Sequence, residues 1–320
     1  MPRALLIYNP NAGRFPPETA ARRAAERLRA HGWEIDIEPT RDAGHVTELA
    51  TCAASEGLDA LILAGGDGSI GRALRGLIGT STALGVLPTG TANVWARELG
   101  LPRIGPGGQK AVIENAEMLA SARVKSVDAG LCNGVPFLLW TGIGLDAIVV
   151  RGAERHRSHL KKRLALPEYT LRTLLAAAHW PGAEARITGH RAGGTGQVDF
   201  SGALQLAVVT NISRYAGGYA VLSPQAVLDD GEMDLWIFKG RGAGAALRHA
   251  RNLLRGNHVN DKDTLRIPFT RIEIEFERPV AAHRDGETVP DAGRIAITVC
   301  KQALKILCPE TTEMRTAPFA

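Results

Sequence analysis

The sequence contains little cysteine and few aromatic residues, with 4 cysteines and 5% Phe, Trp and Tyr among 320 residues. The cysteines stand at positions 52, 132, 300 and 308 and form neither a CxxC pair nor a Cys/His spacing. This pattern excludes a disulfide framework or a zinc site as the element that organises the fold. No apolar run approaches the roughly 18 residues that a membrane-spanning helix requires, and the N-terminus lacks the apolar core of a signal peptide. We therefore expect a soluble intracellular protein.

Neither sign of charge dominates, since 38 Lys and Arg residues oppose 33 Asp and Glu residues, for a formal net charge of +5. One segment, Arg151–Arg163, has a formal charge of +5 by itself, because it contains six basic residues and only one acid, Glu154. Such a segment suits an anionic partner, although a solvated helix face is the plainer interpretation. The chain shows no nucleic-acid-binding motif and few aromatic side chains for base stacking, so we expect no nucleic-acid partner.

The first part of the chain alternates between strand and helix patterns. Strands are predicted at 4–8, 33–38, 58–64 and 83–87, and helices at 17–31, 45–56, 70–78 and 93–99. Segments 58–64 and 83–87 are apolar almost throughout, which is typical of strands buried on both faces. Strands that alternate with helices imply a parallel sheet covered on both sides. This part therefore predicts a doubly wound α/β domain.

After about residue 122 the pattern becomes rich in strands. Asn133-Gly134 between apolar runs predicts a hairpin. Further strands are predicted at 203–210, 233–238, 271–277 and 294–299, with helices near 160–179 and 243–255. Short strands in succession favour an antiparallel β-sandwich. We expect the α/β domain over 1–122, a β-rich domain over 123–302, and a C-terminal strand and tail over 303–320. The pattern does not decide which of the two domains this last strand pairs with.

A glycine-rich segment, Gly66–Gly71, follows the predicted strand 58–64 and fits the dinucleotide fingerprint G-x-G-x-x-G. That fingerprint requires an acidic residue about 20 positions later, at the end of the next strand. The next strand ends in Val86-Leu87-Pro88-Thr89-Gly90, which contains no acid. Asp67 between the glycines would also repel a pyrophosphate. Hydride transfer is therefore disfavoured.

A phosphate cradle explains the same segment better. Glycines at 65, 66 and 68 let the backbone N–H groups approach a phosphate, and the following helix N-terminus adds positive potential. Asp67 then faces a magnesium ion or a nucleotide hydroxyl, and Ser69 adds a hydroxyl donor. The plainer alternative is a tight turn in which Asp67 caps the helix. Two more glycine-bearing loops, at 9–13 and 87–93, follow predicted strands at the same sheet edge, as in a nucleotide crevice.

Taken together, five motifs resemble the diacylglycerol kinase catalytic-domain family, which includes bacterial lipid kinases and sphingosine kinases. They are NPNAG (9–13), GGDGS (65–69), LPTGTAN (87–93), the stretch 211–238 and DGE (285–287). The resemblance runs in register over nearly the whole chain. GGDG alone is shared with NAD kinases and phosphofructokinases, so the joint occurrence of the motifs makes the resemblance specific.

The resemblance implies ATP-dependent phosphorylation of a hydroxyl on a diacylglycerol-, sphingoid- or glycerophospholipid-type lipid. It implies that Glu287 is the general base and that Asp67 holds phosphate and metal as a second catalytic residue. The implied nucleotide-binding residues are Asn9, Pro10, Asn11, Ala12, Gly13, Thr40, Gly65, Gly66, Asp67, Gly68, Ser69, Ile70, Gly71 and Thr91. From the residues alone, Asp285-Gly286-Glu287 would be an ordinary hairpin turn.

The segment 224–238 resembles a family segment that holds a structural magnesium ion in bacterial members. Its implied ligands are the carboxylate of Asp230 and the backbone carbonyls of Val227 and Glu232. Hard oxygen ligands of this kind suit Mg²⁺, although the residues alone indicate only an acidic turn before a strand. Val94 departs from the family, many members of which have Asp there, while Ser69 in place of Thr keeps the hydroxyl.

Two other functions remain open from the sequence. One is a kinase of a soluble substrate such as NAD, and the other is a nucleotide-binding regulatory protein without turnover, which the loss of a carboxylate at Val94 allows. The lipid-kinase interpretation implies a role in phospholipid metabolism, with a lipid substrate and transient contact with an anionic membrane surface. It implies a cytoplasmic protein, peripheral at the inner membrane surface, and leaves a homodimer open.

Overall fold

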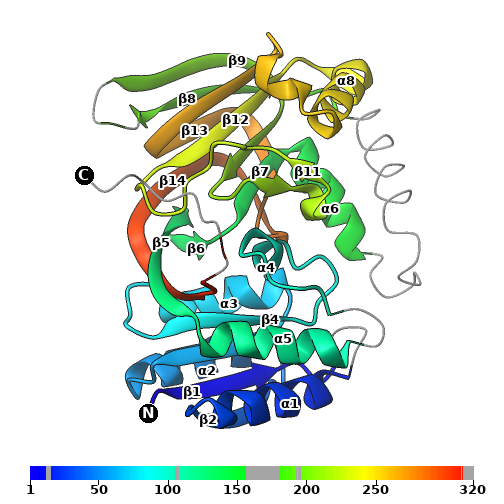
Figure 1. Ribbon diagram of the computed structural model, residues 1–320. Coiled ribbons are helices and arrows are strands. Elements are labelled where there is room, and N and C mark those ends of the chain that lie inside the picture. The colour runs from blue at the N-terminus through cyan, green and yellow to red at the C-terminus, as the bar shows by residue number, and fades with distance from the viewer. Residues whose placement is uncertain are drawn as a thin grey trace.

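The computed structural model describes residues 1–11, 16–104, 108–155, 180–191, 193, 196–310 and 312. Figure 1 shows a layered α/β region formed by the first part of the chain and a strand-rich region formed by the second. Ala12 and Gly13 of the predicted nucleotide site, residues 156–163 of the basic segment and the predicted helix at 160–179 lie outside the described residues.

The first region is a parallel sheet with helices on both faces. Its strands are β1 (Arg3–Tyr8), β2 (Glu34–Pro39), β3 (Ala60–Gly65) and β4 (Ala83–Pro88), in the order β4-β3-β1-β2. Helices α1 (Pro17–Ala30) and α5 (Gln109–Ala120) share a core cluster on one face, and α2 (Ala43–Ser55), α3 (Asp67–Leu77) and α4 (Val94–Glu98) share another. Every residue of β3 and β4 is buried. The predicted doubly wound architecture is confirmed.

The second region is built mainly from antiparallel strands around a separate apolar core. Its long strands are β5 (Arg123–Cys132), β8 (Ala183–Arg191), β9 (Gln197–Thr210), β12 (Met233–Lys239), β13 (Thr264–Arg284) and β14 (Glu287–Cys308). The short strands are β6 (Val135–Phe137), β7 (Trp140–Gly144), β10 (Arg214–Tyr215) and β11 (Ala220–Val221). The helices are α6 (Leu145–Arg155), α8 (Gly242–Leu254) and the 3₁₀ turns η2 (Ala216–Gly218) and η3 (Asn257–Asn260). The antiparallel arrangement agrees with the β-sandwich expectation.

One long strand, β14, joins the two regions. Its first part pairs with β13, and its last part pairs antiparallel with β5 and, at Ile306, parallel with Leu84 of β4. Segment 303–307, whose partner the sequence left open, is therefore the end of β14 and lies beside the parallel sheet. Among the described residues, twelve strands form one continuous sheet.

The predicted Asn-Gly turn is confirmed, but the predicted start of one helix is wrong. Asn133 and Gly134 both have positive φ, 49° and 78°, and connect β5 to β6 as the Asn-Gly signal predicts. Helix α3 begins at Asp67, three residues before the predicted start, so Asp67 and Gly68 form its first turn.

Helix α5 was not predicted from the sequence. Its buried residues Val112, Ala116 and Leu119 have helical spacing and pack on the α1 side of the sheet. Within the described residues, no helix is both long and apolar enough to cross a membrane.

Candidate active site

The carboxyl ends of the parallel strands are aligned at one edge of the sheet. Tyr8 pairs with Pro39 and with Ala64, and Gly65 pairs with Pro88, so the loops that follow the four strands leave from the same edge. Parallel α/β sheets bind ligands at such edges. Thr40 lies there, buried, with its hydroxyl donating to the Tyr8 carbonyl at 3.3 Å.

The predicted phosphate loop occupies the turn from β3 into α3. Gly66 is the residue that precedes the helix, and the Ser69 N–H donates to its carbonyl at 2.9 Å. A Cβ placed on Gly68 would have no heavy atom within 4 Å, so this side of the helix N-terminus is open. Residues 66–69 are partly exposed, and a helix N-terminus presents backbone N–H groups and positive potential, which suit an anion such as phosphate.

The loop between β4 and α4 packs directly on the phosphate loop. A Cβ on Gly90 would lie 2.6 Å from the Gly66 Cα, so the two backbones approach as closely as glycine alone permits. The Asn93 amide donates to the carbonyls of Pro88 and Gly90 at 2.9 and 3.0 Å. Thr91, also predicted to contact nucleotide, is exposed on this loop. The structure therefore brings these two predicted loops together.

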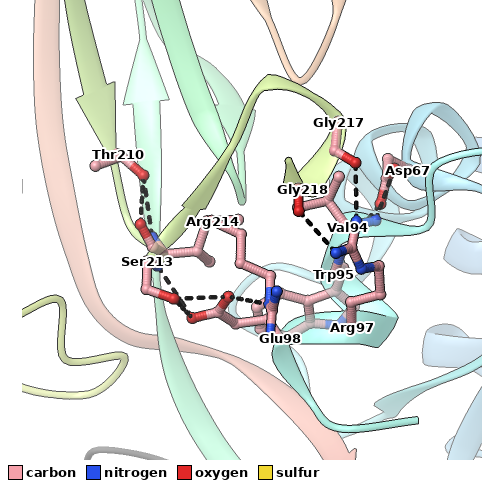
Figure 2. Close-up of polar contacts among 11 residues, drawn as sticks. Asp67, Val94, Trp95, Arg97, Glu98, Thr210, Ser213, Arg214, Gly217 and Gly218 are labelled. Atoms are coloured by element: carbon pink, nitrogen blue, oxygen red, sulfur yellow. Dashed lines mark hydrogen bonds and ion pairs between the residues drawn. The ribbon is translucent and has the colours of Figure 1, made fainter. Parts of the chain in front are cut away.

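Asp67 links the phosphate loop to α4. Its Oδ2 accepts the Val94 N–H at 3.0 Å and its Oδ1 accepts the Trp95 N–H at 3.1 Å, as Figure 2 shows. Burial raises the pKa of this carboxyl, and the two N–H bonds oppose that rise. The sequence offered Asp67 as a cap of its own helix, but the structure shows that it caps α4, a contact across 27 residues.

Replacing Asp67 by Asn should reduce the free energy of unfolding by about 1–3 kcal/mol, because the amide leaves one buried N–H of α4 without an acceptor. Chemical denaturation measures this loss. Asp36→Asn, at an exposed position of β2, is the matched control and should change stability by less than about 0.5 kcal/mol. Equal stability of the two variants would contradict the capping role.

The predicted catalytic turn connects β13 to β14. Asp285 and Gly286 have φ of 46° and 82°, the type I′ geometry that Asp-Gly favours, so the hairpin interpretation is confirmed. The Asp285 side chain is buried and accepts the backbone N–H groups of residues 138–140 at 2.8 to 3.1 Å. Burial raises its pKa to about 6, although the three N–H bonds oppose this, and the negative charge of Asp67 raises it further.

Glu287, the predicted base, lies against the helix that follows the phosphate loop. Its Oε1 is 2.8 Å from the Arg72 guanidinium and its Oε2 is 3.0 Å from that of Arg75. Both arginines are on α3, three residues apart and therefore on one side of the helix. The turn of the second region thus lies close to the loops of the first. The sequence did not indicate these arginines, because nothing local pairs them with a residue more than 200 positions away.

A buried pair of side chains, His283 and Asp146, contacts the turn at 285–287. His283 and Asp146 are in contact at 2.7 Å, and the Gly286 N–H donates to the other ring nitrogen of His283 at 3.3 Å. A Cβ on Gly142 would overlap both side chains, so only glycine leaves room for this pair. The sequence missed these residues, because they lie on α6 and β13 and have no shared motif.

Helix α4 is also tied to the hairpin formed by β10, η2 and β11. The Arg97 guanidinium donates to the carbonyls of Gly217 and Gly218 at 2.9 and 2.7 Å (Figure 2). Glu98 accepts the N–H and hydroxyl of Ser213 at 3.0 and 2.7 Å. These contacts connect the phosphate loop, through Asp67 and α4, to the second region.

The predicted magnesium ligands lie on the loop before β12. Asp230 Oδ1 accepts the Glu232 N–H at 3.0 Å, and burial raises the Asp230 pKa to about 6, with nearby Glu232, Asp128 and Asp234 adding to the rise. In the part of the chain that the structure describes, no three His, Cys, Asp or Glu side chains gather at a metal-sized site. A cation here would therefore depend on Asp230 together with backbone carbonyls such as that of Val227.

Comparison with known proteins agrees with this geometry. Residues 3–132 match the model of the diacylglycerol kinase catalytic domain, and residues 141–308 match that of the YegS C-terminal NAD kinase beta sandwich-like domain. The chain is 30% identical over 289 residues to a diacylglycerol kinase of Bacillus subtilis (strain 168), which covers 90% of each chain. The chain belongs to the diacylglycerol kinase family. It is a lipid kinase.

Other relatives of this lipid kinase support the same family. A protein of Pseudomonas syringae pv. syringae (strain B728a) named "Probable lipid kinase YegS-like" is 29% identical over 288 residues, covering 89% of this chain and 87% of the relative. A diacylglycerol kinase structure from Bacillus anthracis str. Sterne has the same fold, with a TM-score of 0.71 and 23% identity over 97% of this chain and 98% of that one. The family resemblance of the motifs is confirmed.

The lipid kinase places its candidate groups on two sides of one interface. The first region contributes the glycine loops and the start of α3, which suit phosphate groups. The second contributes the turn that carries Glu287, a carboxylate able to accept a proton. An anion site with a carboxylate on the facing element is compatible with transfer of a phosphoryl group to a hydroxyl.

Proposed function

We propose that this lipid kinase transfers the γ-phosphate of ATP to a hydroxyl of a diacylglycerol-, sphingoid- or glycerophospholipid-type acceptor. The observation that carries the proposal is the position of Glu287, whose carboxylate contacts Arg72 and Arg75 of the helix that begins at the phosphate loop. Because the acceptor is a lipid, the kinase would work transiently at an anionic membrane surface, on the cytoplasmic side. A free hydroxyl near neutral pH is a weak nucleophile, so a base at this position would activate the hydroxyl by accepting its proton.

The residues present fit the phosphates of a nucleotide. Asn93 Oδ1 and Thr89 Oγ1 are buried beside the two glycine loops, and neither has a hydrogen-bond partner among the described residues. A buried polar atom without a partner calls for an explanation, and a bound ligand would supply one. The N–H groups at the start of α3 and the Ser69 hydroxyl would hold the phosphates, and Gly68 would leave them space. ATP supplies the phosphoryl group and a stable leaving group.

Glu287 would take the proton of the acceptor hydroxyl during transfer. The two arginines fix its position, while each carboxylate oxygen keeps a second lone pair for the hydroxyl proton. The Asp285 bonds to residues 138–140 and the contact of Gly286 with His283 hold the turn in place. The proton would move to Glu287 as the hydroxyl oxygen bonds to the γ-phosphorus, while the bond from that phosphorus to the oxygen bridging the β- and γ-phosphates breaks and ADP leaves.

A magnesium ion also suits the residues of the 227–232 loop. Burial raises the pKa of Asp230, with a further rise from the charges of Glu232, Asp128 and Asp234, and a bound cation would offset both effects on the ionised carboxylate. Asp230 and the carbonyls of Val227 and Glu232 are hard oxygen donors of the type Mg²⁺ prefers. We assign them a structural role away from the reacting atoms. Asp67 would face the nucleotide-associated Mg²⁺ with the lone pairs that its bonds to α4 leave free, and Val94 offers no second carboxylate.

Magnesium should stabilise the protein in a pH-dependent way. Because the Asp230 pKa is raised from 3.8 to about 6 in the folded protein, the metal-free protein gains stability from this group at low pH and loses it as pH rises through 6. Ionised Asp230 can bind Mg²⁺, whereas the protonated acid cannot. We expect Mg²⁺ to raise Tm by roughly 2–4 °C at pH 7.5 and much less at pH 5.

Differential scanning fluorimetry with and without Mg²⁺ at each pH measures this difference. Asp230→Asn should abolish the shift, and Asp229→Asn is the matched control that should keep it. A shift of equal size at both pH values, or one retained by Asp230→Asn, would remove Asp230 as a ligand.

An acceptor panel tests the proposed function. Purified protein is incubated with ATP and Mg²⁺ and with diacylglycerol, a sphingoid base, a glycerophospholipid or NAD, and each acceptor is analysed by mass spectrometry. We expect one phosphoryl group to be added to a lipid and none to NAD. Phosphorylation of NAD alone would favour the soluble-substrate alternative, and no product with any acceptor would favour a regulatory nucleotide-binding protein.

A further inference from the structure

Apolar side chains are exposed on three neighbouring elements of the second region. Two lie on the β10–β11 hairpin, two on α8 and one on η3, and they are between 44% and 65% exposed: Tyr219, Val221, Leu247, Leu254 and Val259. Helix α8 packs beside both β11 and η3, as Figure 1 shows for α8 and β11. We call these five residues and the cations described below the α8 face. Exposed apolar groups gathered on adjacent elements indicate an interaction surface.

The orientation of α8 is fixed by its inner side. Leu253 packs against the cluster that contains Tyr215 and Leu222, and the buried His249 donates from Nε2 to the Lys239 carbonyl at 2.8 Å. Leu247 and Leu254 are seven residues apart and therefore project from the same side of the helix. The fold thus holds these two leucines toward solvent while the opposite side is anchored.

The turn η3 is anchored in the same way. His258 is buried, donates from Nε2 to the Leu222 carbonyl at 2.8 Å, and packs its ring on Trp236 with centroids 5.0 Å apart. Leu222 directly follows β11, so this bond holds η3 against the end of the hairpin. Val259, the next residue after His258, is 44% exposed on this anchored turn.

Cations outnumber acids among the charged residues of the α8 face and its surroundings. Three exposed cations lie on α8 or shortly after α8 and η3 in the sequence: Arg251, Arg255 and Lys262. None of them forms an ion pair with a described acidic residue. Of the two acids close in the sequence, Asp263 pairs with Arg248, whereas Asp261 accepts from the neutral amide of Asn252 and keeps its charge. Apolar groups accompanied by unpaired cations complement the interface of a membrane that contains anionic lipid.

We propose that the α8 face docks on the surface of a bilayer that contains anionic lipid, an inference that rests on the proposed lipid-kinase function. The leucines, Val259 and the hairpin tip would enter the interfacial layer, and the cations would meet lipid phosphates. Arg97 ties this hairpin, through Gly217 and Gly218, to the helix that Asp67 caps. Docking therefore places the membrane next to an element that is joined directly to the candidate active site, which shortens the path of a lipid acceptor.

Vesicle co-sedimentation of the full chain tests this docking. The probes are phosphatidylcholine vesicles with and without phosphatidylglycerol, and the variants are Leu247→Glu/Leu254→Glu and Arg251→Glu/Arg255→Glu. We expect affinity for the anionic vesicles to fall about tenfold for each leucine and about fivefold for each cation. Val124→Glu, an exposed apolar position on β5 that is 56% exposed, is the matched control and should bind as the wild type does.

Two further measurements separate the docking from the proposed function. All variants should phosphorylate a monomeric short-chain acceptor at the wild-type rate, and only the α8-face variants should lose activity on acceptor embedded in vesicles. Wild-type binding to vesicles by both double variants, with kinase activity intact, would overturn the docking alone. Absence of activity on every acceptor in the wild type would instead reject the proposed function. A dimer that the leucine variant dissociates, with vesicle binding unchanged, would assign the α8 face to a second copy of the chain.

Discussion

Replacing Glu287 by Gln is expected to lower kcat by about 10²–10⁴-fold, the usual contribution of a positioned general base. The amide keeps the shape of the side chain but cannot accept the proton of the acceptor hydroxyl. The affinity for ATP should change little, because Glu287 contacts two arginines of α3 rather than the phosphate loop itself. The loss should persist at saturating lipid, since it arises in the transition state. Steady-state kinetics and calorimetric titration of ATP measure the two effects separately.

Glu277→Gln is the matched control, because Glu277 is an exposed acid on β13, the strand that pairs with the start of β14. It should retain wild-type kcat. Glu287→Gln should also remain folded, since a half-exposed ion pair contributes only about 0–1 kcal/mol. A Glu287→Gln enzyme with wild-type kcat would leave Asp285-Gly286-Glu287 as a hairpin turn without a catalytic role.

Gly68→Ala is expected to weaken ATP binding about tenfold or more. In the protein alone the added Cβ meets no heavy atom within 4 Å, so any obstruction comes from a ligand that occupies this space. Alanine in the first turn of α3 should leave thermal stability unchanged or slightly higher, because alanine favours a helix by about 1 kcal/mol relative to glycine. A binding defect without a folding defect is therefore the signature of the phosphate site.

Gly244→Ala in α8 is the matched control, since this glycine is also helical and its Cβ position is also open. It should bind ATP as the wild type does. Calorimetry with a non-hydrolysable ATP analogue gives both affinities. Unchanged affinity in Gly68→Ala would reject this part of the chain as the phosphate loop.

Much of the fold follows from local patterns. The apolar runs of β3 and β4 identify strands buried on both faces, and Asn133-Gly134 identifies a turn whose two residues need positive φ. Helix α5 escaped prediction because its short amphipathic pattern lies between glycine- and proline-rich residues and a strand. The path of β14 could not be read locally either, because each part of that strand pairs with a different partner.

The candidate site also combines features that the sequence predicts with features that only the tertiary fold reveals. Loops after parallel strands share one sheet edge, so the sequence alone predicts that the segments around Gly66 and Gly90 approach each other. The contacts of Glu287 with Arg72, and of His283 with Asp146, join residues separated by 215 and 137 positions, and no periodicity encodes such pairings. Asp285 illustrates both cases. Its turn was predictable, but its burial and its three backbone bonds depend on the tertiary fold.

The most direct test of phosphoryl transfer to a lipid follows two labels of ATP. The protein is incubated with Mg²⁺, mixed micelles of the lipid acceptors and ATP labelled at either the γ- or the α-phosphate, and the lipids are extracted into organic solvent. We expect the γ-label to enter the organic phase in proportion to the ADP formed, while the α-label stays in the aqueous phase. Absence of the γ-label from the lipid, or transfer of the α-label, would contradict the assignment of this site to γ-phosphate transfer onto a lipid hydroxyl.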